Sequence, residues 1–204
     1  MSRKIKEKKE RALGEKLFLK PERCNSHKCV MIRRPYGPGQ HGQKRKKRPS
    51  EYGRQLQEKQ KIQIVYGLTN NQMENIFRKY SGQPDKIVST LEKRLDRVVF
   101  LLGIAGAPRV SRQLVSHGHI MVNGRKMTIP SYQVEEGDVV SIRPQSRKIQ
   151  MFEDLGDTLK KHKTPEWLEM NADADKEEGK CIGEPTEDAI HPFDINLVGE
   201  FYNR

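Results

Sequence analysis

Between residues 108 and 143 the chain gathers side chains that suit contact with a polyanion. Arginine and lysine neutralise phosphates, while histidine, asparagine and glutamine reach phosphate oxygens, ribose hydroxyls and base edges. These residues alternate with aliphatic positions, so we expect them on the exposed side of the segment. The predicted contacts are Arg109, Arg112, Gln113, His117, His119, Asn123, Arg125 and Lys126. Such residues are also common on ordinary solvated surfaces, so this set alone leaves both interpretations open.

The same segment predicts the elements that must position these side chains. Pro108 suits the first turn of a helix, because its missing N–H would have had no partner there. Gly118 suits the left-handed position after the helix ends. Two alternating runs then flank Asn123-Gly124, a dipeptide typical of tight hairpin turns, and residues 139–143 form a third strand. We therefore predict a small helix-plus-hairpin module with an aliphatic buried side.

Composition supports a polyanionic partner. The chain has 204 residues, a formal net charge of +12 and a pI near 9.6. Hydrophobic residues make up only 34% and aromatic residues 6%, so the core is modest. Residues 1–62 hold 20 Lys and Arg against 6 Asp and Glu, whereas residues 153–204 hold 6 against 14. This segregation predicts one face for nucleic acid and a separate acidic segment.

Several classes of protein are disfavoured. No apolar run approaches the roughly 20 residues that span a membrane. The basic N-terminus lacks the apolar centre of a secretion signal. Three cysteines without such a signal argue against a disulfide framework. We expect a cytosolic, reduced protein with no membrane partner.

A cysteine pair near the N-terminus could suggest a metal. Cys24, His27 and Cys29 are zinc-ligand types at close spacing, but structural zinc needs four ligands. His41 is a candidate fourth ligand without specific support, and Cys181 is distant in sequence. We expect unligated thiols and no zinc, with Cys24 and Cys29 a residual half-site at most.

A second cation-rich stretch precedes the helices. Three glycines and one proline at 37–42, preceded by Pro35, prevent regular structure and let the backbone approach a ligand. Five consecutive cations follow at 44–48, where mutual repulsion favours a place beside phosphate. A disordered basic tail or nuclear-localisation signal is the alternative, but the Gly-Pro stretch and two rings favour an ordered RNA-contacting loop. The predicted contacts are Arg33, Arg34, Tyr36, His41, Lys44, Arg45, Lys46, Lys47 and Arg48.

Helices should connect the two basic regions. Ser50 can cap a helix over 51–66, and Thr69 opens another with a capping box. An apolar stripe over 87–102 marks a third helix. These helices add the predicted RNA contacts Tyr52, Arg54, Lys59, Lys61, Arg94 and Arg97.

The remaining segments have weaker patterns. Residues 1–20 resemble a charged helix that a partner would order. Trp167 supplies an aromatic anchor in the acidic segment, and residues 172–180 indicate a polar loop. The apolar residues of 195–201, Ile195, Leu197 and Phe201, suggest a closing strand.

The expected fold class is α+β, with a mostly helical N-terminal domain that the C-terminal segment closes and an inserted small helix-plus-β-hairpin RNA-binding module. The expected divisions are a basic RNA-binding extension and loop over 1–48, a helical domain over 49–90, the module over 91–150, and an acidic segment over 151–204 that packs back on the helical domain.

These motifs together resemble the uS4 family of bacterial-type small-subunit ribosomal proteins, over nearly the whole chain. The module alone, which that family shares with several RNA-modifying enzymes and a tRNA synthetase, is weakly specific. The N-terminal motif and the ending together are specific. The resemblance rests on PGQHG at 38–42, SEYGRQLQEKQK at 50–61, LEKRLDRVV at 91–99, RQLVSHGHIMVNG at 112–124, IPSYQV at 129–134 and VGEFY at 198–202.

The resemblance implies a non-enzymatic structural protein of the small ribosomal subunit, in the cytoplasm, without cofactor or small-molecule substrate. Similar proteins bind a multi-helix junction in the 5′ domain of small-subunit rRNA and nucleate assembly. They lie where mRNA enters the subunit, support translational accuracy, and neighbour other small-subunit proteins, notably the fifth. Some repress their own operon or assist antitermination. Some hold zinc with four cysteines, and Glu7 and Glu10 stand here where the first two would be.

Two alternative functions remain, both known from proteins that carry the same RNA-binding module. One is an RNA-modifying enzyme, because Arg94-Leu95-Asp96 matches the catalytic triplet of one pseudouridine synthase group. Its catalytic domain would need far more chain than this. The other is a stress-response RNA binder, but those are shorter and lack the 37–42 loop and the acidic segment.

Overall fold

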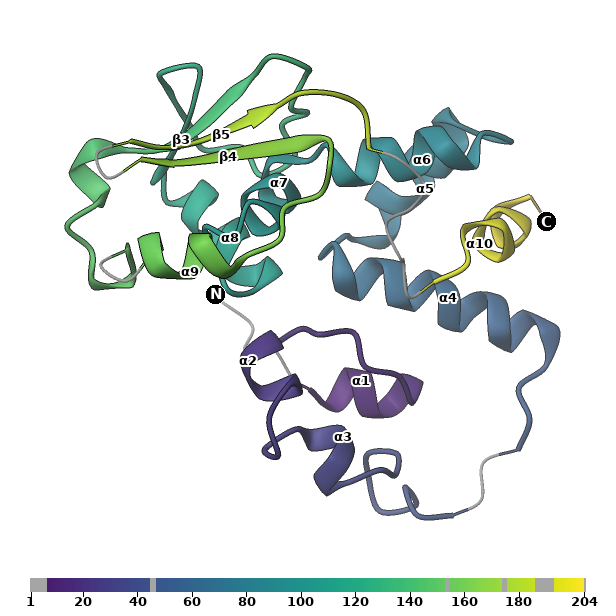
Figure 1. Ribbon diagram of the computed structural model, residues 1–204. Coiled ribbons are helices and arrows are strands. Elements are labelled where there is room, and N and C mark those ends of the chain that lie inside the picture. Colours follow the sequence, from purple (N-terminus) through teal and green to yellow (C-terminus); the bar gives the residue numbers. More distant parts are fainter. Residues whose placement is uncertain (1–6, 45–46, 153–154, 174–175, 186–192, 204) are drawn as a thin grey trace. The chain divides into compact units, whose positions relative to one another are not determined.

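The structure is a computed structural model that describes residues 7–44, 47–152, 155–173, 176–185 and 193–203 (Figure 1). Its helices and five-stranded antiparallel sheet confirm the α+β class. The chain divides into two compact units, residues 1–87 with 190–204 and residues 88–189. We call the first the helical lobe and the second, which is inserted into it, the sheet unit.

The helical lobe contains α1 (Lys8–Leu13), α2 (Pro21–Cys24), α3 (Val30–Arg33), α4 (Glu51–Val65), α5 (Asn70–Lys79) and α10 (Ile195–Tyr202). Helix α6 (Pro84–Glu92) crosses the boundary. The sheet unit contains α7 (Leu95–Leu101), α8 (Pro108–Ser116), β1 (Ile120–Val122), β2 (Arg125–Met127), β3 (Val139–Ile142), the 3-10 turns η1 (Pro144–Ser146) and η2 (Gln150–Phe152), α9 (Leu155–Lys161), β4 (Leu168–Asp173) and β5 (Lys176–Cys181). None of the helices in the described ranges has the length and apolar character to span a membrane.

The predicted caps of the central helices are confirmed. The Gly53 N–H donates to Ser50 Oγ (3.2 Å) at the start of α4. At the start of α5, Thr69 and Gln72 form the reciprocal capping box. Each cap satisfies first-turn N–H groups that the helix itself leaves without a partner. Local sequence therefore sets where α4 and α5 begin.

The N-terminal helix is much shorter than the charged helix predicted over 1–20, whose first six residues lie outside the described part. Helix α1 ends at Gly14, which has a φ of +84°. The buried carboxylate of Glu10 then accepts the N–H groups of Leu17 (3.1 Å) and Leu19 (3.2 Å). Because these bonds satisfy non-helical backbone, the chain turns away here and does not continue as a helix.

The closing segment is a helix, so the strand predicted from Ile195, Leu197 and Phe201 is wrong. Asp194 caps α10 by accepting two backbone N–H groups of its first turn (2.9 and 3.3 Å). A short apolar run fits both the strand and the helix period. The cap and the tertiary contacts decide between them.

Helix α10 closes the lobe, as predicted, by packing against α4 and α5. The rings of Phe77 and Tyr202 stack with centroids 5.0 Å apart, and Phe77 is buried in the core. The Gln55 amide donates to Glu200 (3.1 Å). Residues far apart in sequence thus complete one helical layer.

The sheet has the strand order β2-β1-β3-β5-β4, with antiparallel neighbours throughout. The predicted hairpin forms between β1 and β2, where Asn123 (φ +50°) and Gly124 (φ +75°) make the turn. Both positive φ angles match the mirror-image turn that Asn-Gly favours. The predicted third strand, β3, pairs with β1.

The acidic segment differs most from expectation. Residues 172–180 do not form the predicted loop, because β5 pairs with β3 on one side and β4 on the other. Gly179 lies so close to Leu102 that a Cβ there would approach Leu102 Cδ1 to 2.4 Å. The described acidic residues up to 185 therefore belong to the sheet unit, and the described C-terminal residues that pack on the helical lobe include those of α10.

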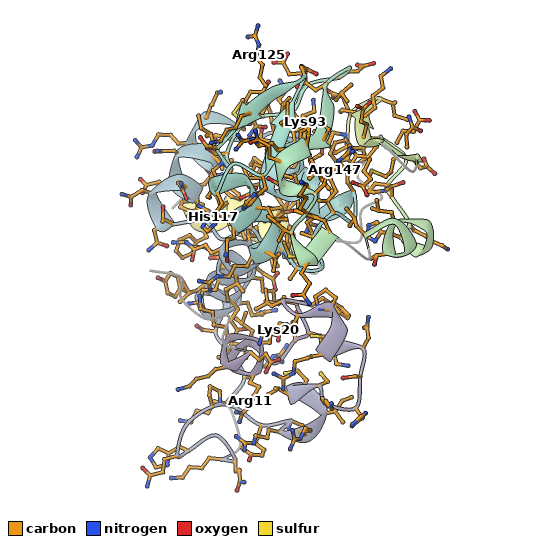
Figure 2. The ribbon with its side chains drawn as sticks, turned by 90° about the vertical axis from the view of Figure 1, so that its left-hand side faces the viewer. Arg11, Lys20, Lys93, His117, Arg125 and Arg147 are labelled. Carbon is orange, nitrogen blue, oxygen red and sulfur yellow. The ribbon has the colours of Figure 1, made fainter. Side chains whose placement is uncertain are left out.

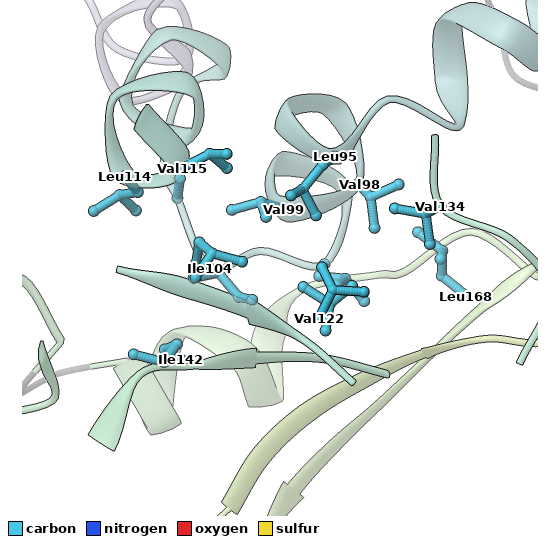
Figure 3. Close-up of a cluster of buried hydrophobic side chains, with 14 of the residues drawn as sticks. Leu95, Val98, Val99, Ile104, Leu114, Val115, Val122, Val134, Ile142 and Leu168 are labelled. Atoms are coloured by element: carbon cyan, nitrogen blue, oxygen red, sulfur yellow. The ribbon is translucent and has the colours of Figure 1, made fainter. Parts of the chain in front are cut away.

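Helices α7, α8 and α9 contribute to a single apolar core on the sheet (Figure 3). Trp167, the predicted anchor, is buried in it. Each fully buried Val or Leu contributes about 1.5–3 kcal/mol relative to an exposed one. The core includes Leu95, Val98, Val99, Ile104, Leu114, Val115, Val122, Val134, Ile142 and Leu168.

The single helix predicted over 87–102 is split into α6 and α7. Between them, the Lys93 carbonyl accepts the Val134 N–H (2.8 Å) and the Leu95 N–H donates to the Tyr132 carbonyl (2.8 Å). Extended backbone at the break is therefore paired across the fold, which compensates for the lost helical hydrogen bonds. The apolar stripe continues through both helices, so periodicity alone could not reveal the break.

Candidate nucleic-acid interface

The structure brings the predicted residues of the module onto α8 and the hairpin that follows it. The Arg125 side chain projects outward from the sheet unit (Figure 2). Arg109, Arg112 and His119 are half-buried. The exposed members are Gln113, His117, Asn123, Arg125 and Lys126.

Gly118 lets the hairpin approach the end of α8. Its φ is +75°, as predicted for a residue after a helix end. A Cβ at this position would lie 2.2 Å from Lys126 Cε, so the lysine stem crosses directly over the glycine. The Lys126 side chain on β2 therefore lies beside Gly118, just after the end of α8.

Arg94 is not on the surface where the sequence placed it. Its guanidinium makes two hydrogen bonds to Asp96 (3.0 and 2.8 Å), and both side chains are about 5% exposed. Arg112 Nη1 lies 3.7 Å from the same carboxylate. The buried pair fixes Asp96, and Asp96 in turn orients Arg112 on the exposed side. A carboxylate enclosed in this way is poorly placed to attack an RNA base.

Two more predicted contacts take part in ion pairs. Arg97 pairs with Glu92 (2.9 Å) and is half-buried. Lys61 is buried between Glu15 (2.6 Å) and Glu58 (2.7 Å). Burial acts to lower the pKa of Lys61, but hydrogen bonds to the two carboxylates outweigh it and raise the pKa. Lys61 therefore joins α4 to the segment after α1.

The other predicted contacts of α4 lie near α10. Lys59 Nζ lies 4.5 Å from the centroid of the Phe201 ring and 5.1 Å from that of Tyr202. Tyr52 is exposed and its ring contacts Phe201 at a centroid distance of 5.6 Å. Arg54 is exposed. Tyr52 and Arg54 remain accessible to a ligand, whereas Lys59 is oriented by the aromatic rings.

Asn123 serves the turn as well as the surface. Its amide donates to Asp138 (2.7 Å), and its carbonyl accepts the Val139 N–H (2.9 Å). These bonds tie the hairpin turn to the start of β3. The side chain predicted to contact RNA is thus engaged within the protein.

The glycine-rich loop is braced by α1. The Arg11 guanidinium donates to the carbonyls of Tyr36 (3.0 Å) and Gly37 (3.1 Å). A Cβ at Gly42 would lie 1.9 Å from the Gly37 oxygen, so the loop closes tightly only with glycine there. Arg45 and Lys46 lie outside the described residues. The exposed predicted contacts of this region are Arg33, Arg34, Tyr36, His41, Lys44, Lys47 and Arg48.

The cysteine pair does not form a recognisable metal site. Cys24 and Cys29 are buried free thiols, and burial raises the pKa of Cys24. Glu7 pairs with Arg23 (3.3 Å), while Glu10 binds backbone as described above. Within the described ranges, no three His, Cys, Asp or Glu side chains are grouped to hold a metal ion.

The sequence interpretation missed two residues beside His119. Its Nδ1 lies 2.9 Å from Oγ of the buried Ser146, and the Arg143 N–H donates to the His119 carbonyl (2.8 Å). Burial lowers the pKa of His119, and the charges of His117, Arg143 and Lys126 lower it further. Arg143 follows β3 in the antiparallel register with His119, so strand pairing could have suggested it.

A helix and hairpin that carry cations on a small sheet, together with a separate braced basic loop, define a nucleic-acid-binding protein. The Ribosomal protein S4/S9 N-terminal domain family matches residues 2–96, and the S4 domain family matches residues 93–140. The chain belongs to the uS4 family of ribosomal proteins.

Curated relatives match the chain almost from end to end. The small ribosomal subunit protein uS4 of Halothermothrix orenii is 45% identical over 94% of this chain and 93% of its own. The uS4 protein of Thermus thermophilus is 44% identical with the same coverage. That of Pelobacter propionicus is 45% identical over 92% of this chain and 91% of its own.

Proposed function

We propose that this protein is a structural, non-enzymatic component of the small ribosomal subunit that binds rRNA, and so resides in the cytoplasm within the ribosome. The observation that carries the proposal is the cation-bearing face of α8 and the β1–β2 hairpin, in a chain that matches uS4 proteins along 94% of its length. Such a face can neutralise phosphates and reach 2′-hydroxyls in a shallow RNA groove.

The proposal extends to the RNA that is bound. The glycine-rich loop and the sheet unit offer two basic surfaces, which suits a junction where several RNA helices meet. We infer the 5′-domain junction of small-subunit rRNA, bound early in assembly. The cations of the run from Lys44 to Arg48 would face mRNA where it enters the subunit and support accuracy. The fifth small-subunit protein would be a neighbour.

The test is binding to a 5′-domain junction fragment and to an unrelated structured RNA of equal length, over a salt series. Each phosphate contact contributes somewhat under one unit to the slope of log affinity against log salt. We expect a steep slope with both RNAs and a preference for the junction that persists at high salt. Equal affinity for the two RNAs would contradict junction-specific binding.

A triple variant locates the surface. Replacing Arg109, Arg112 and Arg125 by alanine should lower the affinity for the junction about tenfold to a hundredfold and reduce the salt slope by roughly one unit per contact. The matched control replaces three cations of the exposed face of α5 and α6, Arg78, Lys79 and Lys86. If the control weakens binding as much as the triple variant, the interface lies elsewhere.

A further inference from the structure

His119 stands in a distinct polar environment at the start of β1. Its ring is half-buried, with Nδ1 2.9 Å from the Ser146 hydroxyl and its centroid 6.0 Å from that of His117. The Arg143 backbone donates to the His119 carbonyl, so Arg143 emerges directly across from it on the neighbouring strand. Because Nδ1 is engaged with Ser146, Nε2 is the ring nitrogen left to donate to a ligand.

Side chains that can carry positive charge lie around this ring on three elements. His117 comes from the end of α8, Lys126 from β2 and Arg143 from the end of β3. All three disfavour the charged form of the His119 ring. Ser146 of η1 contributes only a neutral hydroxyl. Among the described residues, the structure records no ion pair for Lys126 or Arg143.

Such a grouping is unfavourable without an anion. Each cation disfavours a further positive charge nearby, and among the described residues no carboxylate acts on His119. A bound phosphate would reverse this balance, because it attracts all of these cations and stabilises a charged imidazole. The chemistry therefore fits one phosphodiester of an RNA backbone.

We propose that His119, Lys126 and Arg143 form a phosphate-binding site in which RNA binding is coupled to uptake of one proton by His119. The inference rests on the proposed RNA-binding function and adds a pH dependence to it. In the charged ring, Nδ1–H donates to Ser146 Oγ and Nε2–H donates to a phosphate oxygen. The proton comes from solvent, and no covalent bond forms or breaks.

The direction of the pH effect follows from linkage. In the free protein the pKa of His119 lies below its ordinary value of 6.5, and bound phosphate raises it. Between these two pKa values RNA binding takes up a proton, so affinity rises as pH falls. Stability of the free protein changes in the opposite direction: it declines as pH falls through 6.5, because the unfolded chain takes up the proton more readily.

The test measures junction RNA affinity of the full chain from about pH 8 to about pH 5.5 at constant ionic strength. We expect the wild-type affinity to rise about five- to tenfold, since one coupled proton gives at most about tenfold per pH unit. His119→Gln should abolish this rise. Arg125→Gln, the control, should weaken binding equally at every pH, because Arg125 is not among the groups that act on His119.

Three results would overturn the site. The first is an unchanged pH dependence in His119→Gln, which would assign the titration to the RNA. The second is loss of the dependence in His117→Gln but not in His119→Gln. The third needs no variant and applies if His119→Gln misfolds: an NMR pKa of His119 in the wild-type protein that is the same with and without RNA.

Failure of the proposed function is distinguishable from failure of the site. If neither RNA binds at any pH, rRNA binding itself is wrong. The NMR titration is then repeated with inorganic phosphate as the probe. A raised pKa of His119 supports the site, and an unchanged pKa overturns it.

Discussion

The sheet unit and the N-terminal part of the helical lobe, residues 7–44, support their cations in different ways. In the sheet unit the cation-bearing face rests on a continuous apolar core. In residues 7–44, short helices bury few apolar side chains. The Arg11 guanidinium holds the glycine-rich loop, and the Glu10 carboxylate holds the segment after α1. One surface is rigid before RNA arrives, whereas the other depends on a few polar contacts.

This difference bears on how each surface would bind. A preorganised surface loses little conformational entropy on binding, so its contacts translate more fully into affinity. A loosely held one loses more but can adapt its shape to the RNA. We therefore expect the sheet unit to set the docking position and residues 7–44 to adjust to it.

The largest expected effect comes from Asp96→Ala in the sheet unit. The change leaves the buried Arg94 without its partner and should lower the free energy of unfolding by about 3–5 kcal/mol. Glu74→Ala is the control, because its pair with Arg78 is exposed and contributes about 0.3–0.5 kcal/mol. Denaturant unfolding measures both. Equal losses would show that burial of the pair is unimportant.

Glu10→Ala should destabilise residues 7–44 without affecting the sheet unit. It removes the acceptor of two buried N–H groups. Each group left unsatisfied should lower the stability of this region by about 1–3 kcal/mol. Hydrogen exchange should accelerate in residues 7–44 and stay unchanged in β1 and β3. Glu10→Gln retains an acceptor oxygen and should be milder. Faster exchange throughout the sheet unit would argue against independent stability of the two regions.

Gly42→Ala should act on the loop alone. The added methyl group would clash with the Gly37 carbonyl, so the loop must open. Overpacking of this kind destabilises a site by about 1–3 kcal/mol. Limited proteolysis within 37–44 should accelerate while the midpoint of thermal unfolding of the sheet unit stays constant. Gly156→Ala, where nothing lies within 4 Å of the new Cβ, is the control. Unchanged proteolysis would show that the loop tolerates the methyl.

Thr69→Ala should have the smallest effect and lower the free energy of unfolding by about 1 kcal/mol, because it removes one side of the capping box of α5. Thermal unfolding of the double variant with Gln72→Ala should show little further loss, since the two side chains form one reciprocal unit. Fully additive losses would instead show that each side chain acts by itself.

Local signals were the reliable part of the sequence interpretation. Pro108, Gly118 and Asn123-Gly124 indicated the helix and hairpin, because each imposes a backbone geometry by itself. The caps at Ser50 and Thr69 fixed two helix starts in the same way. Arg125 and Lys126 of the hairpin are exposed, in agreement with the sequence interpretation, and so are Lys44, Lys47 and Arg48 of the cation run.

The errors occurred where tertiary contacts decide. Strand β5, Lys-Glu-Glu-Gly-Lys-Cys, has no apolar alternation, and its strand form comes from pairing on both sides and from Gly179 against Leu102. Burial of Arg94 and Lys61 likewise depends on carboxylates that reach them in the folded chain. The Ser146 and Arg143 neighbours of His119 required the strand register.

The contact of α10 with α4 also sets an order of events during synthesis. The ribosome makes α4 early, but the Gln55–Glu200 and Tyr52–Phe201 contacts must wait until the entire sheet unit has been translated. At a typical rate of about 5–20 residues per second, that interval lasts roughly 7–30 seconds. During it the sheet unit is translated while the apolar side of α4 and α5 is still uncovered. During this interval α4 and α5, although they are translated before the sheet unit, still lack the helix that completes their packing.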